Sequence, residues 1–359
     1  MRISLLTCSP GEELYSTFGH SAIRVVDSVH KDDIVFNYGT FNFDDPNFYS
    51  EFTRGKLEYY LSTQDFPQFK ADYIFEKRGM TEQVLNLTCT EKQRMYALLK
   101  NNLEDNNKYY KYDFLFDNCT TRLRDLLEKA SDSAVHFGIV VKQKATFRKL
   151  IYEYLDRNDK QWSKLGIDML LGARLDRVMN EKEVMFLPDY LMKSFDSSTI
   201  GNKPVVAEKT KAITVEEGVE KKNFITSPLF IFSVLVIIVM ALTTLKSERM
   251  VWYLKFFDSL FFFLVGAMGI LMLFMWFGTE HIMCKDNLNL LWAWPTHAVF
   301  AFYMNSKKRW RSNYFKATAV VNSVLLLLWF ILPQHLNTAL IPIVLMIVFR
   351  SAVRGYKRI

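Results

Sequence analysis

The chain is poor in the residues that build metal centres and disulfide frameworks, since it has only four cysteines and six histidines among 359 residues. The largest group of potential metal ligands lies at 280–297, where the spacing matches no standard ligand pattern. We therefore expect no metal and no cofactor. One disulfide is permitted, for instance between Cys8 and Cys89, but spacing alone does not establish it.

The beginning of the chain lacks the long apolar run of a signal sequence, because 1–7 is too short to form one. We expect the native signal to have been removed from this chain. Leu5 to Cys8 superficially resembles a lipoprotein cleavage box, but no apolar region precedes it and Thr7 is larger than the residue expected there. We therefore predict a first strand at 2–8, which the turn residues at 9–11 end.

The two halves of the chain differ in polarity, and together they average to a mean hydropathy of +0.01. Residues up to about 222 mix charged, aromatic and polar side chains, whereas residues beyond 224 form long apolar blocks. The first half has few βαβ patterns and no internal repeat, which favours an α+β fold. Within it we predict a helix at 12–18, strands at 21–26 and 34–38, and an aromatic, mostly helical region from there through 77. We predict an α+β domain at 1–195, a polar linker at 196–225 and a helical membrane domain at 226–359.

The second half predicts about five membrane spans. The apolar blocks lie at 228–245, 256–277, 288–305, 316–333 and 336–349. The first four approach or exceed the ~18 residues that a spanning helix needs, and the fifth is shorter. An odd number of spans puts the basic loops and the basic C-terminal tail in the cytoplasm, as the positive-inside rule requires. The first domain then lies outside the cytoplasm, and the net charge of +7 requires no nucleic-acid partner.

A cysteine opens a predicted amphipathic helix in the first half. Leu123, Leu126 and Leu127 follow Cys119 at helical spacing, so we expect the thiol at the N-terminus of this helix. Unpaired backbone N–H groups and the helix dipole favour the thiolate there, and the thiolate is the nucleophilic form. A buried structural cysteine is the alternative, because cysteine is among the residues most often buried.

A histidine that enters a predicted strand is the candidate base for this thiol. His20 precedes a β-branched run at 21–26, although a histidine satisfied by a backbone carbonyl is the alternative. A thiol dyad usually needs a third polar group to orient the imidazole, and either Asn37 or Tyr38 on the next strand is the candidate. Tyr15 is either an oxyanion donor or an aromatic residue packed under the strand.

The residues around this pair resemble a known family. The motifs are Leu5-Leu6-Thr7-Cys8, Pro10-Gly11, Glu13-Leu14-Tyr15-Ser16, Phe18-Gly19-His20, Ala22-Ile23-Arg24, Asn37-Tyr38-Gly39, Arg54-Gly55-Lys56 and Asp117-Asn118-Cys119-Thr120-Thr121. This set resembles the Lnb family, the Bacteroides-type lipoprotein N-acyltransferases with a periplasmic N-terminal domain. In the second half, the residues that look like the family's outer-face motif are His281, Asn287-Leu288-Asn289-Leu290-Leu291-Trp292, Pro295 and His297. The order of histidine before cysteine is also similar to the papain-like, circularly permuted NlpC/P60 and lecithin-retinol-acyltransferase-like thiol fold.

The resemblance implies an acyl transfer in two steps at the bacterial inner membrane, with 1–195 in the periplasm and the C-terminus in the cytoplasm. Cys119 attacks an acyl ester of a membrane phospholipid, His20 accepts its proton, and a thioester forms. The acyl chain then passes to the α-amine of the lipidated N-terminal cysteine of a diacylated lipoprotein. The alternatives are a periplasmic peptidoglycan amidase or peptidase of NlpC/P60 type and a non-catalytic membrane protein that binds lipid or a partner.

Several further residues are candidates for substrate binding. Arg54, Lys56 and Arg122 are expected to hold a phospholipid phosphate, with solvated surface charge as the alternative. His297 lies inside a predicted span, where ionisable residues are functional candidates. Four further residues are expected to complete a polar floor that receives lipid headgroups, with hydrogen bonding between helices as the alternative: His281, Asn287, Asn289 and Trp292. An aromatic cluster either guides acyl chains, rests on the bilayer interface or packs in the core: Phe41, Phe43, Phe48, Tyr49, Phe52, Tyr59 and Tyr60.

Overall fold

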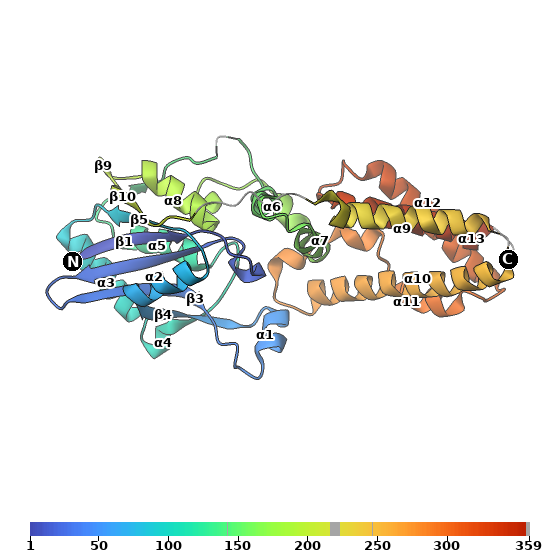
Figure 1. Ribbon diagram of the computed structural model, residues 1–359, viewed down its shortest axis with the longest axis horizontal. Coiled ribbons are helices and arrows are strands. Elements are labelled where there is room, and N and C mark those ends of the chain that lie inside the picture. The colour runs from blue at the N-terminus through green and yellow to red at the C-terminus, as the bar shows by residue number, and fades with distance from the viewer. Residues whose placement is uncertain (142, 216–222, 246, 357–359) are drawn as a thin grey trace. The chain divides into compact units, whose positions relative to one another are not determined.

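The chain divides into two compact units in the computed structural model, which describes residues 1–141, 143–215, 223–245 and 247–356 (Figure 1). The first unit comprises Met1–Tyr154 and Val178–Val219, and the second comprises Leu155–Arg177 and Glu220–Ile359. The first unit is α+β and the second is helical, as predicted. The boundary at 195 is corrected, because the segment Leu155–Arg177 leaves the first unit and belongs with the helices of the second.

A seven-stranded antiparallel sheet lies at the centre of the first unit, in the order β10-β5-β1-β2-β3-β4-β6. Its strands are β1 (Arg2–Cys8), β2 (His20–Asp27), β3 (Asp32–Thr40), β4 (Glu58–Asp65), β5 (Met80–Leu85), β6 (Tyr109–Lys111) and β10 (Val206–Ile213). A smaller sheet consists of β7 (Val135–His136), β8 (Thr199–Ile200) and β9 (Lys203–Pro204). The strand β1 is buried from its second residue onward, and its only charged residue, Arg2, is the one that is exposed.

Helices cover both faces of the large sheet. The helix α2 (Phe66–Phe75) packs on one face against Leu6 and Ala22. The helices α3 (Cys89–Asn101), α5 (Cys119–Ala130) and α8 (Pro188–Ser197) pack on the other face against Leu5 and Ile23. Neighbouring residues of β1 and β2 thus enter different cores, as the alternation of side chains along a strand requires. The remaining helices near this sheet are α1 (Phe48–Arg54), α4 (Asp105–Lys108) and α6 (Phe147–Arg157).

The predicted linker at 196–225 is wrong over 196–215, and its residues 216–222 lie outside the described residues. Val206–Ile213 forms β10, which pairs with β5 at the edge of the sheet. Most side chains of β10 are exposed while its backbone is hydrogen-bonded to one neighbour. The polar composition therefore belongs to an exposed edge strand, because such a strand buries little side-chain surface.

The local predictions near the thiol site are mostly confirmed. The predicted strands at 3–8, 21–26 and 34–38 are β1, β2 and β3, and the predicted cysteine helix is α5. The predicted helix at 12–18 is only a 3-10 turn at Leu14–Ser16. The strand β4 lies within the region that we predicted to be mostly helical, and its aromatic and β-branched residues suit a strand.

The second unit consists of helices. They are α7 (Gln161–Leu170), α9 (Pro228–Thr244), α10 (Glu248–Phe277), α11 (Thr296–Phe300), α12 (Arg309–Leu328) and α13 (Ile341–Tyr356). Among the described residues, two helical segments are long and apolar enough to cross a membrane, Glu248–Phe277 and Thr338–Tyr356. Pro228–Thr244 is apolar but shorter. The prediction of about five spans is therefore not confirmed.

The predicted span at 288–305 is not one helix. It consists of a 3-10 turn at Leu288–Leu291, the short helix α11 and another 3-10 turn at Ala301–Tyr303. Pro295 interrupts the segment because proline provides no backbone N–H. This irregular backbone lies directly against α10, where a Cβ atom at Gly269 would come within 2.0 Å of the Ala293 carbonyl oxygen. Glycine therefore permits the close approach.

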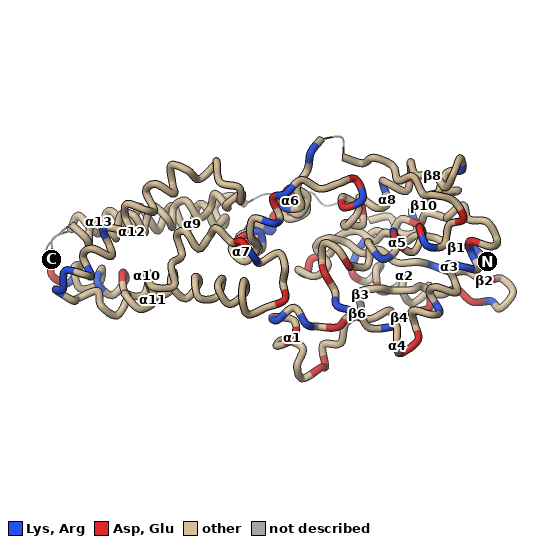
Figure 2. Tube along the Cα trace, turned by 180° about the vertical axis from the view of Figure 1, so that it is seen from behind, with Lys and Arg blue, Asp and Glu red and all other residues tan. Residues whose placement is uncertain are grey.

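Positive charge gathers at the end of the helical unit where α13 ends (Figure 2). Asp258 of α10 is buried there and accepts hydrogen bonds from Arg350 at 2.6 and 2.8 Å. It also accepts one from Arg354, so a buried ionic group connects α10 with α13. Three basic residues of the topology prediction, Lys246, Lys357 and Arg358, lie outside the described residues.

Candidate active site

Cys119 is the first residue of α5, and the residue before it caps the helix. The Asn118 side chain accepts hydrogen bonds from the backbone N–H groups of Thr120 at 2.8 Å and Thr121 at 2.9 Å. The hydroxyl of Thr121 accepts in return from the Asn118 N–H at 2.8 Å, which completes a capping box. The predicted position of the thiol at a helix N-terminus is confirmed.

Asn118 also fixes this N-terminus to two other segments. Its side-chain Nδ2 atom donates to the carbonyl oxygens of Phe114 at 2.6 Å and Phe186 at 2.9 Å. Asn118 is 2 % exposed, so these bonds form away from solvent. All hydrogen-bonding groups of this side chain therefore have partners. The oxygen bonds the helix, and the nitrogen bonds the preceding loop and the segment near 180–187 that follows the first part of the second unit in the chain. This makes Asn118 a positioning residue that our sequence analysis did not single out.

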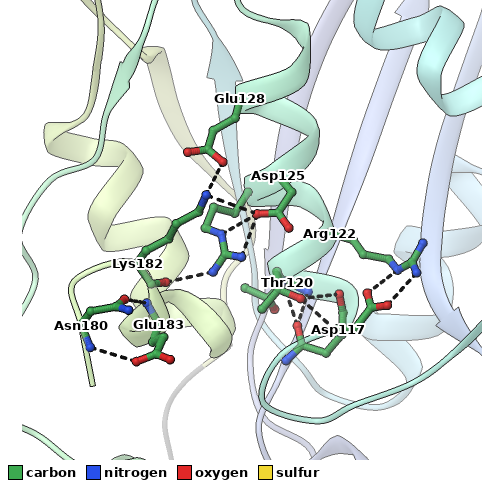
Figure 3. A network of polar contacts seen from close by, with 11 residues as sticks. Asp117, Thr120, Arg122, Asp125, Glu128, Asn180, Lys182 and Glu183 are labelled. Carbon is green, nitrogen blue, oxygen red and sulfur yellow. Dashed lines mark hydrogen bonds and ion pairs between the residues drawn. The ribbon is translucent and has the colours of Figure 1, made fainter. Parts of the chain in front are cut away.

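The returning segment near 180–187 also holds the outer surface of α5 (Figure 3). Arg124 donates to the Lys182 carbonyl oxygen at 2.9 Å, and the Lys182 ammonium lies 2.5 Å from the Glu128 carboxylate. Asn180 and Glu183 bond reciprocally through their backbone N–H groups and side chains. These contacts attach α5, whose first residue carries the thiol, to the returning segment.

Arg122 has a different environment from the one we predicted. Its guanidinium donates to Asp117 at 2.6 and 2.8 Å, and it stacks over the Tyr110 ring with 3.4 Å between the guanidinium carbon and the ring centroid. A fork of this kind satisfies the arginine with a carboxylate. Arg122 therefore joins the loop before Cys119 to β6, and its predicted role in holding a phosphate stays a prediction.

His20 begins β2 and contacts Asn37 of β3. The distance from His20 Nε2 to Asn37 Oδ1 is 2.8 Å. Tyr38 belongs to the opposite face of the strand, is 2 % exposed and accepts a hydrogen bond from Asn102 at 2.6 Å. Of the two residues that the sequence left open, only Asn37 is in position to orient the imidazole.

Cys119 and His20 lie close enough to shift each other's pKa. Burial by itself would raise the pKa of the Cys119 thiol, but the charge and hydrogen bond of His20 and the Ser21 backbone N–H outweigh it and lower the pKa to about 7. Burial by itself would lower the pKa of His20, but Cys119 and Asn37 outweigh it and raise the pKa. The arrangement therefore favours a thiolate beside an imidazolium near neutral pH.

Two tyrosines lie near the thiol, and neither is the tyrosine that we predicted. Tyr15 is 67 % exposed and its ring is not part of the buried site. Tyr110 is 8 % exposed, its hydroxyl faces the Gly39 backbone, and it has no hydrogen-bond partner of normal geometry among the described residues. Burial and the nearby Cys119 raise the pKa of Tyr110 and of Tyr112, so both hydroxyls keep their protons. Tyr110 replaces Tyr15 as the candidate oxyanion donor.

Gly39 makes room beside the thiol. Its φ of +88° lies in the region that favours glycine, at an irregular point in the pairing of β3 with β4. A Cβ atom there would lie 3.7 Å from the Cys119 Cβ and 3.5 Å from a Tyr112 ring carbon. Gly39 therefore places no side chain of its own between Cys119 and the Tyr112 ring.

Two models of one protein family match the chain. The model of the Lnb N-terminal periplasmic domain matches residues 1–156, and the model of the Lnb transmembrane domain matches residues 219–358. The chain belongs to the Lnb family. It is an inner-membrane protein with a periplasmic N-terminal domain followed by a transmembrane domain. Comparisons with curated proteins and with solved structures found no match.

Three residues of the Lnb transmembrane region that we predicted to bind substrate form hydrogen bonds within the helical unit. Asn287 donates to the carbonyl oxygens of Met169 and Leu170 at 2.8 and 3.2 Å. Asn289 donates to the Asp168 carbonyl oxygen at 2.8 Å and accepts from the Trp292 indole at 3.0 Å. These bonds satisfy the carbonyl groups that end α7. The predicted headgroup floor is therefore replaced by a buried network that holds α7.

The two histidines of the Lnb transmembrane region differ in environment. His297 is fully buried, and its Nδ1 atom lies 2.6 Å from the Tyr314 hydroxyl. This contact joins the irregular segment to α12 and agrees with the alternative of hydrogen bonding between helices, while the predicted role of His297 in substrate binding stays a prediction. His281 is half-buried just after α10. Its predicted role in substrate binding stays a prediction.

The remaining predictions concern exposed cations and cysteines. Arg54 ends α1 and Lys56 follows it, and both are exposed in the first unit of this Lnb protein. All four cysteines are free, with Cys8 buried and Cys89 exposed, so the disulfide that the sequence permitted does not form. Within the described ranges, no three histidine, cysteine or acidic side chains lie close enough together to hold a metal ion.

Proposed function

We propose that this protein transfers an acyl chain from a membrane phospholipid to the α-amine of the lipidated N-terminal cysteine of a lipoprotein. The observation that carries the proposal is His20, which contacts Asn37 and lowers the pKa of Cys119, in a chain that also has the Lnb transmembrane domain. A nucleophilic thiol accounts for acyl transfer, and the membrane domain accounts for a lipid donor. Family membership supports an acyltransferase of this general kind.

The first half-reaction forms a thioester on Cys119. The thiolate attacks the carbonyl carbon of the acyl ester, and a tetrahedral oxyanion forms. We assign two donors to this developing charge, the Ser21 backbone N–H, which interacts with Cys119, and the buried Tyr110 hydroxyl. The oxyanion collapses, the bond to the glycerol oxygen breaks, and the His20 imidazolium protonates that oxygen. A lysophospholipid leaves.

The second half-reaction forms an amide. Neutral His20 accepts a proton from the α-amine as the amine nitrogen attacks the thioester carbonyl. The carbon–sulfur bond then breaks, and the sulfur leaves as the thiolate that pairs with the imidazolium again. Burial of Cys119 supports transfer of the acyl chain to the amine, because exclusion of water favours aminolysis of the thioester over its hydrolysis.

The remaining parts of the proposal concern the orientation in the membrane, the type of fold and the contacts with lipid headgroups. We place the C-terminus in the cytoplasm, since the basic residues gather at the end of the helical unit where α13 ends. We also regard the first unit as a permuted, papain-like thiol fold, because the histidine strand precedes the cysteine helix and an asparagine orients the imidazole. Arg54, Lys56 and His281 remain proposed contacts for lipid headgroups.

The test is intact-protein mass spectrometry of the full chain after incubation with phospholipid vesicles. Wild type and a Cys89→Ala control should gain one fatty-acyl mass, and Cys119→Ala should gain none. A synthetic diacylated lipopeptide should remove the increment and appear as the N-acylated product. Cleavage of a peptidoglycan stem peptide without acylation would instead favour the amidase. Absence of any increment together with slow alkylation of Cys119 would favour an inert, structural cysteine.

A further inference from the structure

A row of aromatic rings leads from the surface of the first unit to the thiol. The segment 41–57, which contains α1 and which we call the aromatic lobe, exposes Phe43, Tyr49 and Phe52 at 59, 79 and 52 %. Three exposed aromatic side chains within ten residues are unusual for a surface in contact with water alone. The lobe connects β3, which carries Asn37, with β4.

The rings of the lobe contact one another in sequence. Phe52 and Tyr49 contact Phe48, with centroids 6.0 and 5.2 Å apart, and Phe48 contacts Phe41 at 5.7 Å. Phe41 contacts the Tyr59 ring of β4 at 5.2 Å. The exposed rings are therefore connected through Phe41 to the sheet.

The row continues from the sheet to the catalytic cysteine. The Tyr59 ring stacks on Tyr112 with 4.3 Å between centroids. Tyr112 and Cys119 both lie close to Gly39, because the ideal Cβ position of this glycine is 3.5 Å from a Tyr112 ring carbon and 3.7 Å from the Cys119 Cβ atom. Phe41, Tyr59 and Tyr112 are each only partly buried, so each of these side chains keeps some exposed surface.

We propose that the aromatic lobe docks in the lipid bilayer interface and that its aromatic row is the surface along which an acyl chain reaches Cys119. This inference rests on the proposed function for the identity of the acyl donor. Aromatic rings partition to the headgroup level of a bilayer, and the chain carries its own membrane domain. A row of rings offers the apolar contact that an acyl chain loses when it leaves the bilayer.

Charge does not explain the docking. The lobe carries three acidic residues, Asp44, Asp45 and Glu51, against the two cations Arg54 and Lys56. Attraction to anionic lipids therefore contributes little, and the aromatic side chains carry the interaction. We expect docking to be the same on zwitterionic and on anionic bilayers.

The first test measures depth in the membrane and does not depend on catalysis. Full-length protein with Cys119→Ala and Cys89→Ser, which keeps only the buried Cys8 and Cys284, is placed in phosphatidylcholine nanodiscs. One exposed cysteine, introduced at position 49, 52 or 75 in place of Tyr49, Phe52 or Phe75, carries an environment-sensitive fluorophore. Phe75 is the matched control, because it is 89 % exposed at the end of α2 and outside the lobe. The labels at Tyr49 and Phe52 should be quenched by spin-labelled lipid at least threefold more than the label at Phe75. Equal quenching at all three positions would overturn the docking.

The second test separates delivery of the chain from the chemistry. The double variant Tyr49→Ser, Phe52→Ser should lower the rate of Cys119 acylation from bilayer phospholipid about tenfold, and Phe75→Ser should leave it unchanged. Acylation by the water-soluble ester p-nitrophenyl acetate should be the same in all three proteins. A tenfold loss with both donors would overturn the inference, because the lobe would then shape the site itself. Quenching at the lobe with no acylation of wild type by phospholipid would sink the proposed function and leave the docking standing.

Discussion

The Nε2 atom of His20 lies 2.8 Å from the Oδ1 atom of Asn37, and this contact determines which imidazole nitrogen is left for the thiol. An amide oxygen can only accept, so Nε2 carries the proton and Nδ1 is available to Cys119. The amide also stabilises the imidazolium that forms when the thiol ionises. A side-chain contact between neighbouring strands thereby sets the tautomer of the base.

Replacing Asn37 should slow acylation without unfolding the domain. Asn37→Ala removes the group that orients the imidazole, and we expect the acylation rate to fall about 10²-fold, within the range of a general base that loses its alignment. Tyr38→Phe is the matched control from the next position, and its rate should stay within about threefold of wild type. Equal losses in both variants would mean that β3 as a whole, rather than the amide of Asn37, supports the base. Stopped-flow measurement of the first turnover provides the rates.

The pH dependence of thiol reactivity should reveal the ion pair. The pKa of Cys119 is lowered to about 7, so the alkylation rate by iodoacetamide should rise with pH to a midpoint near 7. His20→Ala removes the largest stabilising influence on the thiolate, and the midpoint should move up toward the ordinary value of 9.0. At pH 7 the variant should therefore react at least tenfold more slowly. A Cys89→Ser background removes the exposed competing thiol, and an unchanged midpoint in His20→Ala would exclude the pair.

The Tyr110 hydroxyl should matter for the transition state and not for the thiolate. Tyr110→Phe removes a single buried hydroxyl that has no partner of normal geometry in the described part of the chain, so the fold loses little. If this hydroxyl donates to the oxyanion, acylation should slow by about 10- to 100-fold, which is at or below the usual effect of one oxyanion donor. The alkylation midpoint should not change, because alkylation forms no oxyanion. A rate equal to that of wild type would remove Tyr110 from the mechanism.

Replacing two helix-capping residues of the first unit should distinguish an effect on the stability of the domain from an effect on the reactivity of Cys119. Asn118→Ala removes the N-cap of α5, and Thr88→Ala removes an equivalent capping box at α3. Each should lower the free energy of unfolding by about 1 kcal/mol, with more for Asn118 because its bonds to Phe114 and Phe186 are also lost. Only Asn118→Ala should raise the midpoint of Cys119 alkylation. A shift in Thr88→Ala as well would mean that global loosening, and not the local cap, controls the thiol.

The network around α7 predicts a structural effect in the membrane region. Asn289→Ala would leave the Trp292 indole and the Asp168 carbonyl oxygen without their buried partner, at a cost of about 1–3 kcal/mol. Thermal unfolding in detergent should therefore occur at a lower temperature. The KM for phospholipid should not change in the protein that remains folded. An increased KM with unchanged unfolding would restore the lipid-binding role that we predicted from sequence.

The sequence by itself determined the local elements that position the thiol. Apolar residues at helical spacing after Cys119 and the β-branched run after His20 predicted α5 and β2, and both form. These patterns are decided within about ten residues, by helix capping and by side-chain alternation. The change in composition near residue 222 likewise separated a polar half from an apolar one, because a membrane requires long apolar segments.

Only the tertiary structure decided which side chains meet. The choice of Asn37 over Tyr38, the role of Tyr110, and the use of Asn287 and Asn289 to end α7 each depend on pairs of residues far apart in the chain. The same holds for β10, whose polar sequence is typical of a linker until its backbone pairs with β5. Local composition does not encode such contacts, because a buried polar group is placed by whichever partner the packed fold brings to it.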